Sequence, residues 1–212
     1  MKKRNIGIMG GTFDPVHNAH LTLARQAYEQ FSLDAVWMLP NGNPPHKKDH
    51  TQADARHRIE MVRQAVQGIP YLELCGLERS MDECHYTYET LRLLGETYPD
   101  VQFYFIMGAD SLFDFDSWKE PDVISRECIL LAAARDLHRR AQLEEKIRSL
   151  EARYGADIRI LDTPDMRIAS EEIRARLRRG EDVSRMLPPA VEDYIRRHHL
   201  YEKESADGCD LY

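Results

Sequence analysis

The sequence is poor in the features that mark secreted, membrane-spanning and nucleic-acid-binding proteins. Its 212 residues include four cysteines, and no two of them form a Cys-x-x-Cys pair, so we expect reduced thiols in a cytoplasmic protein. The chain lacks an apolar run long enough for a transmembrane helix, and its first four residues lead into a strand without the apolar region of a signal peptide. A net charge of −7 argues against a nucleic-acid partner, because such proteins need a basic face.

Short apolar runs alternate with amphipathic segments along the chain. We expect a strand ending near Gly10 and further strands over residues 35–39, 71–74, 101–107, 129–134 and 157–161. Helices are expected from about 14 or 18 to 30, over 53–67 with Ile59, Val62 and Val66 buried, over 87–98 and over 139–154, with two more near the C-terminus. This alternation predicts an α/β fold, a Rossmann-like doubly wound parallel sheet with helices on both faces. We expect a single domain over residues 1–201 and a flexible tail over 202–212.

Residues 5–20 (NIGIMGGTFDPVHNAH) are the most informative stretch. A buried strand ends at Gly10 and Gly11, where backbone amides can come close to a ligand. Asp14 and the proline after it are expected to start a helix, as N-cap and first residue. His17 and His20 then lie on one helix face near its N-terminus, an end that favours phosphate. Loops after Gly10, Pro44 and Gly108 all follow strands and should meet at one edge of the sheet.

Other readings of this stretch are weaker. The absence of Gly-Lys-Ser/Thr excludes a Walker loop, and the His-x-x-His pair lacks the glutamate and third ligand expected of a metal site.

A second stretch, residues 167–176 (RIASEEIRAR), predicts a helix capped by Ser170, with Arg174 one turn into the helix.

Taken together, the two stretches resemble a known superfamily. The first resembles the Gly-x-Phe-x-Pro-x-His-x-Gly-His signature of the nucleotidyltransferases, with Ala19 in place of a glycine. The second is similar to Ile-Ser-Ser-Thr-x-Ile-Arg, but Ala169 and Glu171 replace a serine and a threonine. The resemblance covers residues 7–201. Within the superfamily it is closest to the bacterial nicotinate-nucleotide adenylyltransferases, on the segments 44–47, 86–91 and 108–118.

The resemblance implies an enzyme of NAD biosynthesis that joins ATP and nicotinate mononucleotide, releasing deamido-NAD and pyrophosphate, with Mg²⁺ bridging phosphate oxygens. Carried over to this sequence, the catalytic residues are His17, His20, Lys47 and Arg174. The residues implied for ATP are Gly10, Gly11, Thr12, Phe13, His17, His20, Ile168, Ser170 and Arg174. Those implied for the nicotinate nucleotide are His46, Lys47, Thr87, Asp110 and Trp118.

Particular roles follow from this resemblance. Trp118 would stack on the pyridine ring, and Thr87, expected as the N-cap of its helix, would receive the nicotinate carboxylate. Asp110 would contact a ribose hydroxyl or order its own loop. Three alternatives stay open: nicotinamide mononucleotide as the acceptor, a different acceptor such as phosphopantetheine or a sugar phosphate, and a non-catalytic nucleotide sensor. The sequence makes no prediction of oligomeric state.

Overall fold

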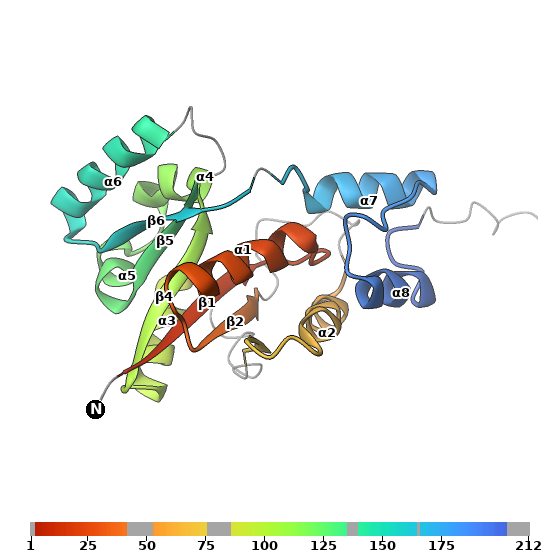
Figure 1. The fold of residues 1–212 in the computed structure, drawn as a ribbon, viewed down its shortest axis with the longest axis horizontal. Coiled ribbons are helices and arrows are strands. Elements are labelled where there is room, and N and C mark those ends of the chain that lie inside the picture. Colours follow the sequence, from red (N-terminus) through yellow and green to blue (C-terminus); the bar gives the residue numbers. More distant parts are fainter. Residues whose placement is uncertain (1–2, 42–52, 76–85, 135–139, 165, 203–212) are drawn as a thin grey trace, which may run out of the picture.

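The fold is built on one parallel sheet whose strand order reverses in the middle. The structure, a computed structural model, describes residues 3–41, 53–75, 86–134, 140–164 and 166–202. Six strands pair in the order β3-β2-β1-β4-β5-β6 (Figure 1). Their bounds are β1 (Arg4–Gly11), β2 (Ala35–Pro40), β3 (Leu72–Leu74), β4 (Val101–Gly108), β5 (Ile129–Ala134) and β6 (Ile158–Asp162). The doubly wound topology predicted from the alternation of elements is confirmed, and the five strands with predicted bounds lie within one residue of them.

Helices cover both faces of the sheet. The described elements are α1 (Asn18–Gln30), α2 (Ala55–Val66), α3 (Thr87–Thr97), α4 (Ala109–Phe113), the 3₁₀ turn η1 (Phe115–Ser117), α5 (Pro121–Glu127), α6 (Arg140–Tyr154), α7 (Ser170–Arg179) and α8 (Pro189–Arg197). In β1, Met9 packs with α1, α2, α7 and α8, whereas Ile6 and Ile8 pack with α3 to α6 on the other face. The strands are therefore buried on both sides, which explains their near-continuous apolar runs.

Two expectations about helices are wrong. Asp14 and Pro15 form a turn, and α1 begins at Asn18 with His17 as its N-cap, because the Asp14 carboxylate is bonded to distant residues instead of to amides of its own segment. In α2 the buried side chains are Arg58, Met61, Val62 and Ala65; Val62 is buried as expected, but Ile59 and Val66 are only partly buried. The buried face of α2 is thus turned from the one we expected.

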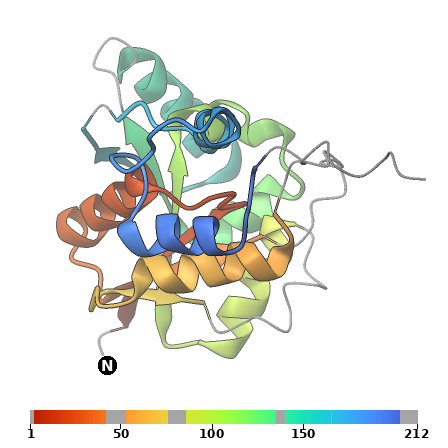
Figure 2. The ribbon, with the colours of Figure 1, turned by 90° about the vertical axis from the view of Figure 1, so that its right-hand side faces the viewer.

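β1 and β4 are the two strands between which the strand order reverses. β1 stays paired with β2 as far as Gly11↔Pro40, but its register with β4 runs only from Arg4↔Val101 to Ile8↔Phe105. The carboxyl ends of β1 and β4 therefore separate, as at the ligand sites of other doubly wound sheets. Helices α2, α7 and α8 lie beyond these strand ends (Figure 1), and α2 runs beside α8 (Figure 2).

Several sequence expectations fall partly outside the described residues. Cys75 and Cys128 are buried free thiols, while Cys84 and Cys209 lie outside the described part, as do the loop around Pro44 and residues 203–212 of the expected tail. Among the helices that the structure describes, none has the length and apolar character needed to cross a membrane.

Candidate functional site

The main chain after β1 turns over a buried aromatic ring. A Cβ added to Gly11 would lie 3.1 Å from the Phe13 ring, closer than side chains ordinarily approach, whereas one on Gly10 would meet Phe105 at an ordinary 3.6 Å. Phe13 is 2% exposed and has a φ of +50°, so its ring is packed under the turn. The absence of a side chain at Gly11 is therefore a packing requirement of the turn.

The two histidines of the first motif lie face to face. The ring centroids of His17 and His20 are 3.7 Å apart and the rings are 19° from parallel. The His17 backbone N–H donates to Nδ1 of His20 at 3.2 Å, and the Phe13 ring meets His20 edge-on at 5.0 Å. Since Nδ1 accepts this bond, the proton of a neutral His20 is on Nε2. His20 can therefore present an Nε2–H donor to a ligand.

A buried arginine ties the ends of β1 and β2 to the start of α2. The Arg58 side chain is 2% exposed and donates to the carbonyl oxygens of Thr12 at 2.8 Å, Asn41 at 2.7 Å and Ala53 at 3.3 Å. Burial lowers the pKa of Arg58, but a guanidinium titrates far above neutrality and stays charged. Sequence reasoning missed this residue.

Asp14 connects the first motif to the C-terminal part of the chain. Its carboxylate is 2% exposed. Oδ1 accepts hydrogen bonds from the Ala53 backbone N–H at 3.0 Å and from the Tyr201 hydroxyl at 2.5 Å. Arg174 Nη1 donates to the Asp14 carbonyl oxygen at 2.6 Å and lies 3.6 Å from Oδ2. Burial, together with the Asp14 charge, raises the pKa of Tyr201, so its hydroxyl remains a donor.

Helix α7 brings the second motif against the first. Its N-cap is Ala169, not Ser170 as expected, because the Ser170 hydroxyl donates to the Pro15 carbonyl oxygen at 3.0 Å. Ile168 packs against the buried core beside it. In the described part of the chain, Arg174 Nε is buried without a hydrogen-bond partner. The two motifs therefore lie against each other, with a buried guanidinium nitrogen of Arg174 beside the histidine turn that makes no hydrogen bond within the described residues.

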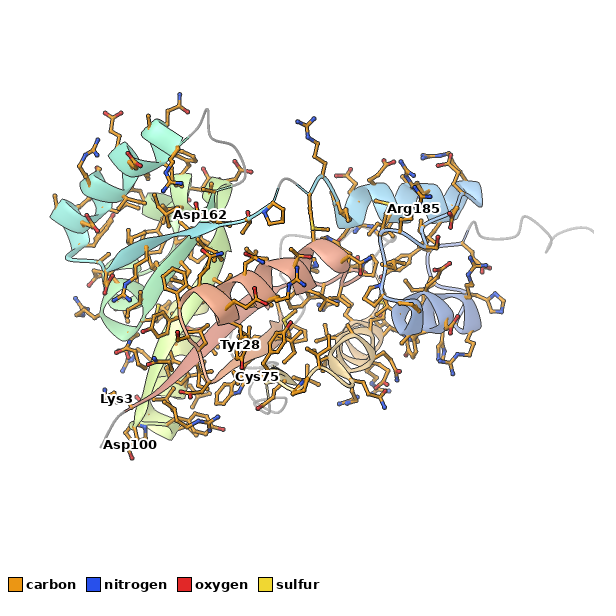
Figure 3. The ribbon with its side chains drawn as sticks, viewed as in Figure 1. Lys3, Tyr28, Cys75, Asp100, Asp162 and Arg185 are labelled. Atoms are coloured by element: carbon orange, nitrogen blue, oxygen red, sulfur yellow. The ribbon has the colours of Figure 1, made fainter. Side chains whose placement is uncertain are left out.

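The start of α1 is fixed from the same side. The Asn18 backbone N–H donates to the Met186 carbonyl oxygen at 2.9 Å, and the Asn18 side chain donates to that of Arg185 at 3.1 Å. Arg185 lies in the segment between α7 and α8 (Figure 3). The C-terminal helices thus position the histidine turn through main-chain contacts.

Two of the residues expected to bind the acceptor, Thr87 and Trp118, lie at the start of α3 and directly after η1. Thr87 is the first residue of α3, whose N-cap is Tyr86 and not Thr87 as we expected; the Tyr86 backbone N–H bonds Glu89 Oε2 at 3.2 Å. Lys119 Nζ lies 4.2 Å from the Tyr86 ring centroid, which brings the turn containing Trp118 beside the start of α3.

Trp118 itself is half-buried, with its ring edge-on to Phe105 at 6.1 Å and tilted against Phe115 at 5.6 Å. Asp110 is exposed in the first turn of α4, directly after β4. The positions of His46 and Lys47 lie outside the described residues.

One carboxylate fastens the Trp118 turn to α6. Asp116 accepts hydrogen bonds from Lys146 Nζ at 2.5 Å, Arg153 Nη1 at 2.9 Å and the Tyr154 hydroxyl at 2.9 Å. The bond from Lys146, followed by that from Tyr154, lowers the pKa of Asp116. Since Asp116 precedes Trp118 by two residues, this network holds the turn that presents the indole.

We expect Asp116→Asn to lower the melting temperature at pH 7 by about 1–3 °C, the scale of a small exposed ionic network. A carboxyl group whose pKa is lowered by folding stabilises the folded state at pH values above its unfolded pKa. This stabilisation is lost as the pH falls through the folded pKa. The difference between variant and wild type should therefore shrink as the pH falls below the ordinary aspartate value of about 3.9 and vanish below the lowered pKa of folded Asp116. Thermal unfolding across this range measures it, with Asp122→Asn, which removes the single pair to Arg126, as control. An Asp116→Asn effect that is the same at both ends of the range would contradict the ionic account.

Within the described ranges, the side chains that commonly bind metals do not gather in threes: no group of three or more His, Cys, Asp or Glu residues is placed to hold an ion. The stacked histidines and the guanidinium of Arg174 are hydrogen-bond donors instead. This donor set suits an anion such as phosphate.

Comparisons with known proteins agree with this geometry. A family model described as cytidylyltransferase-like matches residues 8–176. The chain is 37% identical over 198 residues to the "Probable nicotinate-nucleotide adenylyltransferase" of Lachnoclostridium phytofermentans, covering 93% of this chain and 99% of that one. It is 39% identical over 197 residues to the protein of the same name from Moorella thermoacetica, covering 92% and 91%.

Among solved structures, the chain resembles the Plasmodium falciparum nicotinic acid mononucleotide adenylyltransferase in its complexes with APC and with NaAD. The TM-scores are 0.74 and 0.75 at 24% and 23% identity, and each match covers 93% of this chain and 97% of the other. At this identity the likeness supports the fold.

Proposed function

This chain belongs to the nicotinate-nucleotide adenylyltransferase family of cytidylyltransferase-like proteins, and from that premise we propose that it transfers the adenylyl group of ATP to nicotinate mononucleotide. The products are deamido-NAD and pyrophosphate. One observation carries the proposal: the turn that holds the stacked His17 and His20 also receives Arg174 on its main chain. Two kinds of side chain that can donate hydrogen bonds to phosphate thus come from opposite ends of the sequence to one place.

The residues suit a reaction that needs alignment and charge neutralisation. The attacking group is a phosphate monoester, which is already anionic near neutral pH, so the step needs no general base. His17 and His20 donate to the α- and β-phosphates, with His20 donating through Nε2–H because its Nδ1 accepts the His17 backbone N–H. Arg174 and Lys47 bind the leaving pyrophosphate, and the planar fork of Arg174 suits two phosphate oxygens. Positioning and electrostatic stabilisation supply the rate enhancement in reactions of this kind.

The remaining binding residues divide between the two substrates. Gly10, Gly11, Thr12 and Phe13 contact ATP through their main chain, because the Phe13 ring is buried; Ile168 and Ser170 complete that side. His46, Lys47, Thr87, Asp110 and Trp118 bind the nicotinate nucleotide. Mg²⁺ would accompany the nucleotide and would supply neutralisation of phosphate charge there.

We expect the wild-type protein to release pyrophosphate from ATP with nicotinate mononucleotide and to use nicotinamide mononucleotide at least ~10²-fold less efficiently, because a neutral amide mismatches donors placed for a carboxylate. Thr87→Ala should lose most of this preference for nicotinate mononucleotide. It should stay folded, since the N-cap of α3 is Tyr86. The measurement is kcat/KM for both acceptors.

The matched control is Thr97→Ala, which removes a hydroxyl bonded to the Leu93 carbonyl at the other end of α3. Equal use of both acceptors by the wild type would favour the nicotinamide alternative. Absence of pyrophosphate release with either acceptor, despite ATP binding, would favour another acceptor or the sensor. We further propose that residues 1–201 act as one cytoplasmic domain, with the C-terminal helices completing the ATP side.

A further inference from the structure

The C-terminal contact on Asp14 has a bearing on ATP binding. Within the described residues, the hydrogen bonds to its carboxylate come from Tyr201 and Ala53, and both go to Oδ1. Within the described residues Oδ2 makes no hydrogen bond and lies 3.6 Å from Arg174 Nη1. The carboxylate is thus held by two neutral donors at one oxygen, while the guanidinium stands slightly beyond hydrogen-bond distance from the other.

Removing the Tyr201 hydroxyl would change this balance. A buried carboxylate that loses a donor is stabilised by moving toward the nearest available cation. Arg58 is also near, but its guanidinium is committed to the carbonyl oxygens of Thr12, Asn41 and Ala53. Arg174 is the cation with an unused Nε. The carboxylate would therefore close the gap to Arg174.

We propose that Tyr201 is a positioning residue for ATP binding, because its hydroxyl keeps the Asp14 carboxylate at ion-pair distance from Arg174 and prevents the closer, hydrogen-bonded pair that would compete with phosphate. The proposal rests on the proposed role of Arg174 in phosphate binding. It gives the C-terminal segment a function in the ATP site without direct contact to the nucleotide. The hydrogen bond from Tyr201 to Asp14 then favours binding of Arg174 to phosphate over a closer pair with the Asp14 carboxylate.

The backbone before Tyr201 is consistent with a built contact. His199 and Tyr201 both have positive φ values, +50° and +65°, which are uncommon for residues other than glycine. Tyr201 also packs against the core that α1, α2, α7 and α8 share. The chain therefore adopts an unfavourable conformation where it brings the phenol to Asp14, and the raised pKa keeps the phenol protonated.

The test is ATP binding to Tyr201→Phe, measured by isothermal titration calorimetry with Mg²⁺ and no acceptor. The variant keeps the ring and loses only the hydroxyl. We expect the Kd for ATP to rise about tenfold, the scale of one charge-assisted hydrogen bond. The matched control is Tyr194→Phe, which removes a hydroxyl bonded to His57 at 2.9 Å between α8 and α2. Both variants should lose similar thermal stability, but only Tyr201→Phe should lose ATP affinity.

A second variant separates competition from general damage. Adding Asp14→Asn to Tyr201→Phe removes the competing charge, so the ATP Kd should return to within about threefold of wild type, as coupled neighbours allow. An unchanged Kd in folded Tyr201→Phe, an equal loss in the Tyr194→Phe control, or a double variant that binds no better than Tyr201→Phe would each overturn the proposal. Because no acceptor is present, an error in the proposed acceptor leaves these results unaffected.

Discussion

Replacing His20 by alanine is expected to lower kcat by about 10²–10³, the scale for losing one donor to charge that develops in the transition state. The His17 N–H bond to Nδ1 fixes which nitrogen of a neutral His20 carries the proton, so the lost group is the Nε2–H. Steady-state release of pyrophosphate measures the effect. Survival of activity within a few-fold of wild type would remove His20 from the chemistry.

Two amide variants make this test sharper. In His20→Asn the amide oxygen can still accept the His17 N–H, but nothing replaces Nε2; in His20→Gln the amide nitrogen can reach the Nε2 position. Glutamine should therefore retain more activity than asparagine. The control is His199→Ala, which removes an exposed ring paired with Glu202. Bound zinc that disappears in His20→Ala would instead support a metal site.

Replacing Arg174 by alanine should lower kcat/KM for ATP by about 10²-fold, because it removes a charged donor to phosphate. Arg174→Lys should recover only part of the loss, since an ammonium cannot replace the planar fork. Steady-state kinetics with varied ATP measure both variants. Unchanged kcat and KM in Arg174→Ala would mean that the C-terminal motif is structural only.

Arg174 also donates to the Asp14 carbonyl oxygen, so its loss has a structural part that must be measured separately. Arg174→Ala should lower the melting temperature as well as activity, since a buried carbonyl loses its charged donor. Arg176→Ala is the matched control on the same helix, because Arg176 is partly exposed and forms an ion pair one turn away with Glu172. A control with the same kinetic defect would point to damage of α7 as a whole.

The regular part of the fold could be read from the sequence, and the helix caps could not. Strands such as residues 129–134 are apolar runs bounded by polar residues, a signal that burial on both faces produces directly. The three predicted N-caps, Asp14, Thr87 and Ser170, all failed. For Asp14 and Ser170 the reason is visible: their oxygens bond Tyr201 and Pro15 instead of nearby amides. Local capping rules assume that a polar side chain has no better partner elsewhere in the fold.

The sequence predicted the two motifs of the site but not the residues that hold these motifs in place. Arg58 recurs with Met61, Val62 and Ala65 at helical spacing, so an arginine on an otherwise apolar face was a signal that could have been noticed. Tyr201 offered no such signal, because its partner Asp14 is 187 residues away in the chain. Pairings of that range depend on the assembled fold.

The same separation bears on how the chain folds during synthesis. β1 lies between β2 and β4, so a nascent chain exposes one unpaired edge of its first strand until residues 101–108 have left the ribosome. The contacts of Asp14 with Arg174 and Tyr201 form later still, since these residues follow it by 160 and 187 positions. Non-local pairings of this kind slow folding and leave apolar edges open to aggregation. A chain that ends before α7 would therefore contain all six described strands but lack the contacts of Asp14 with Arg174 and Tyr201. Such a chain would be a substrate for chaperones and proteases.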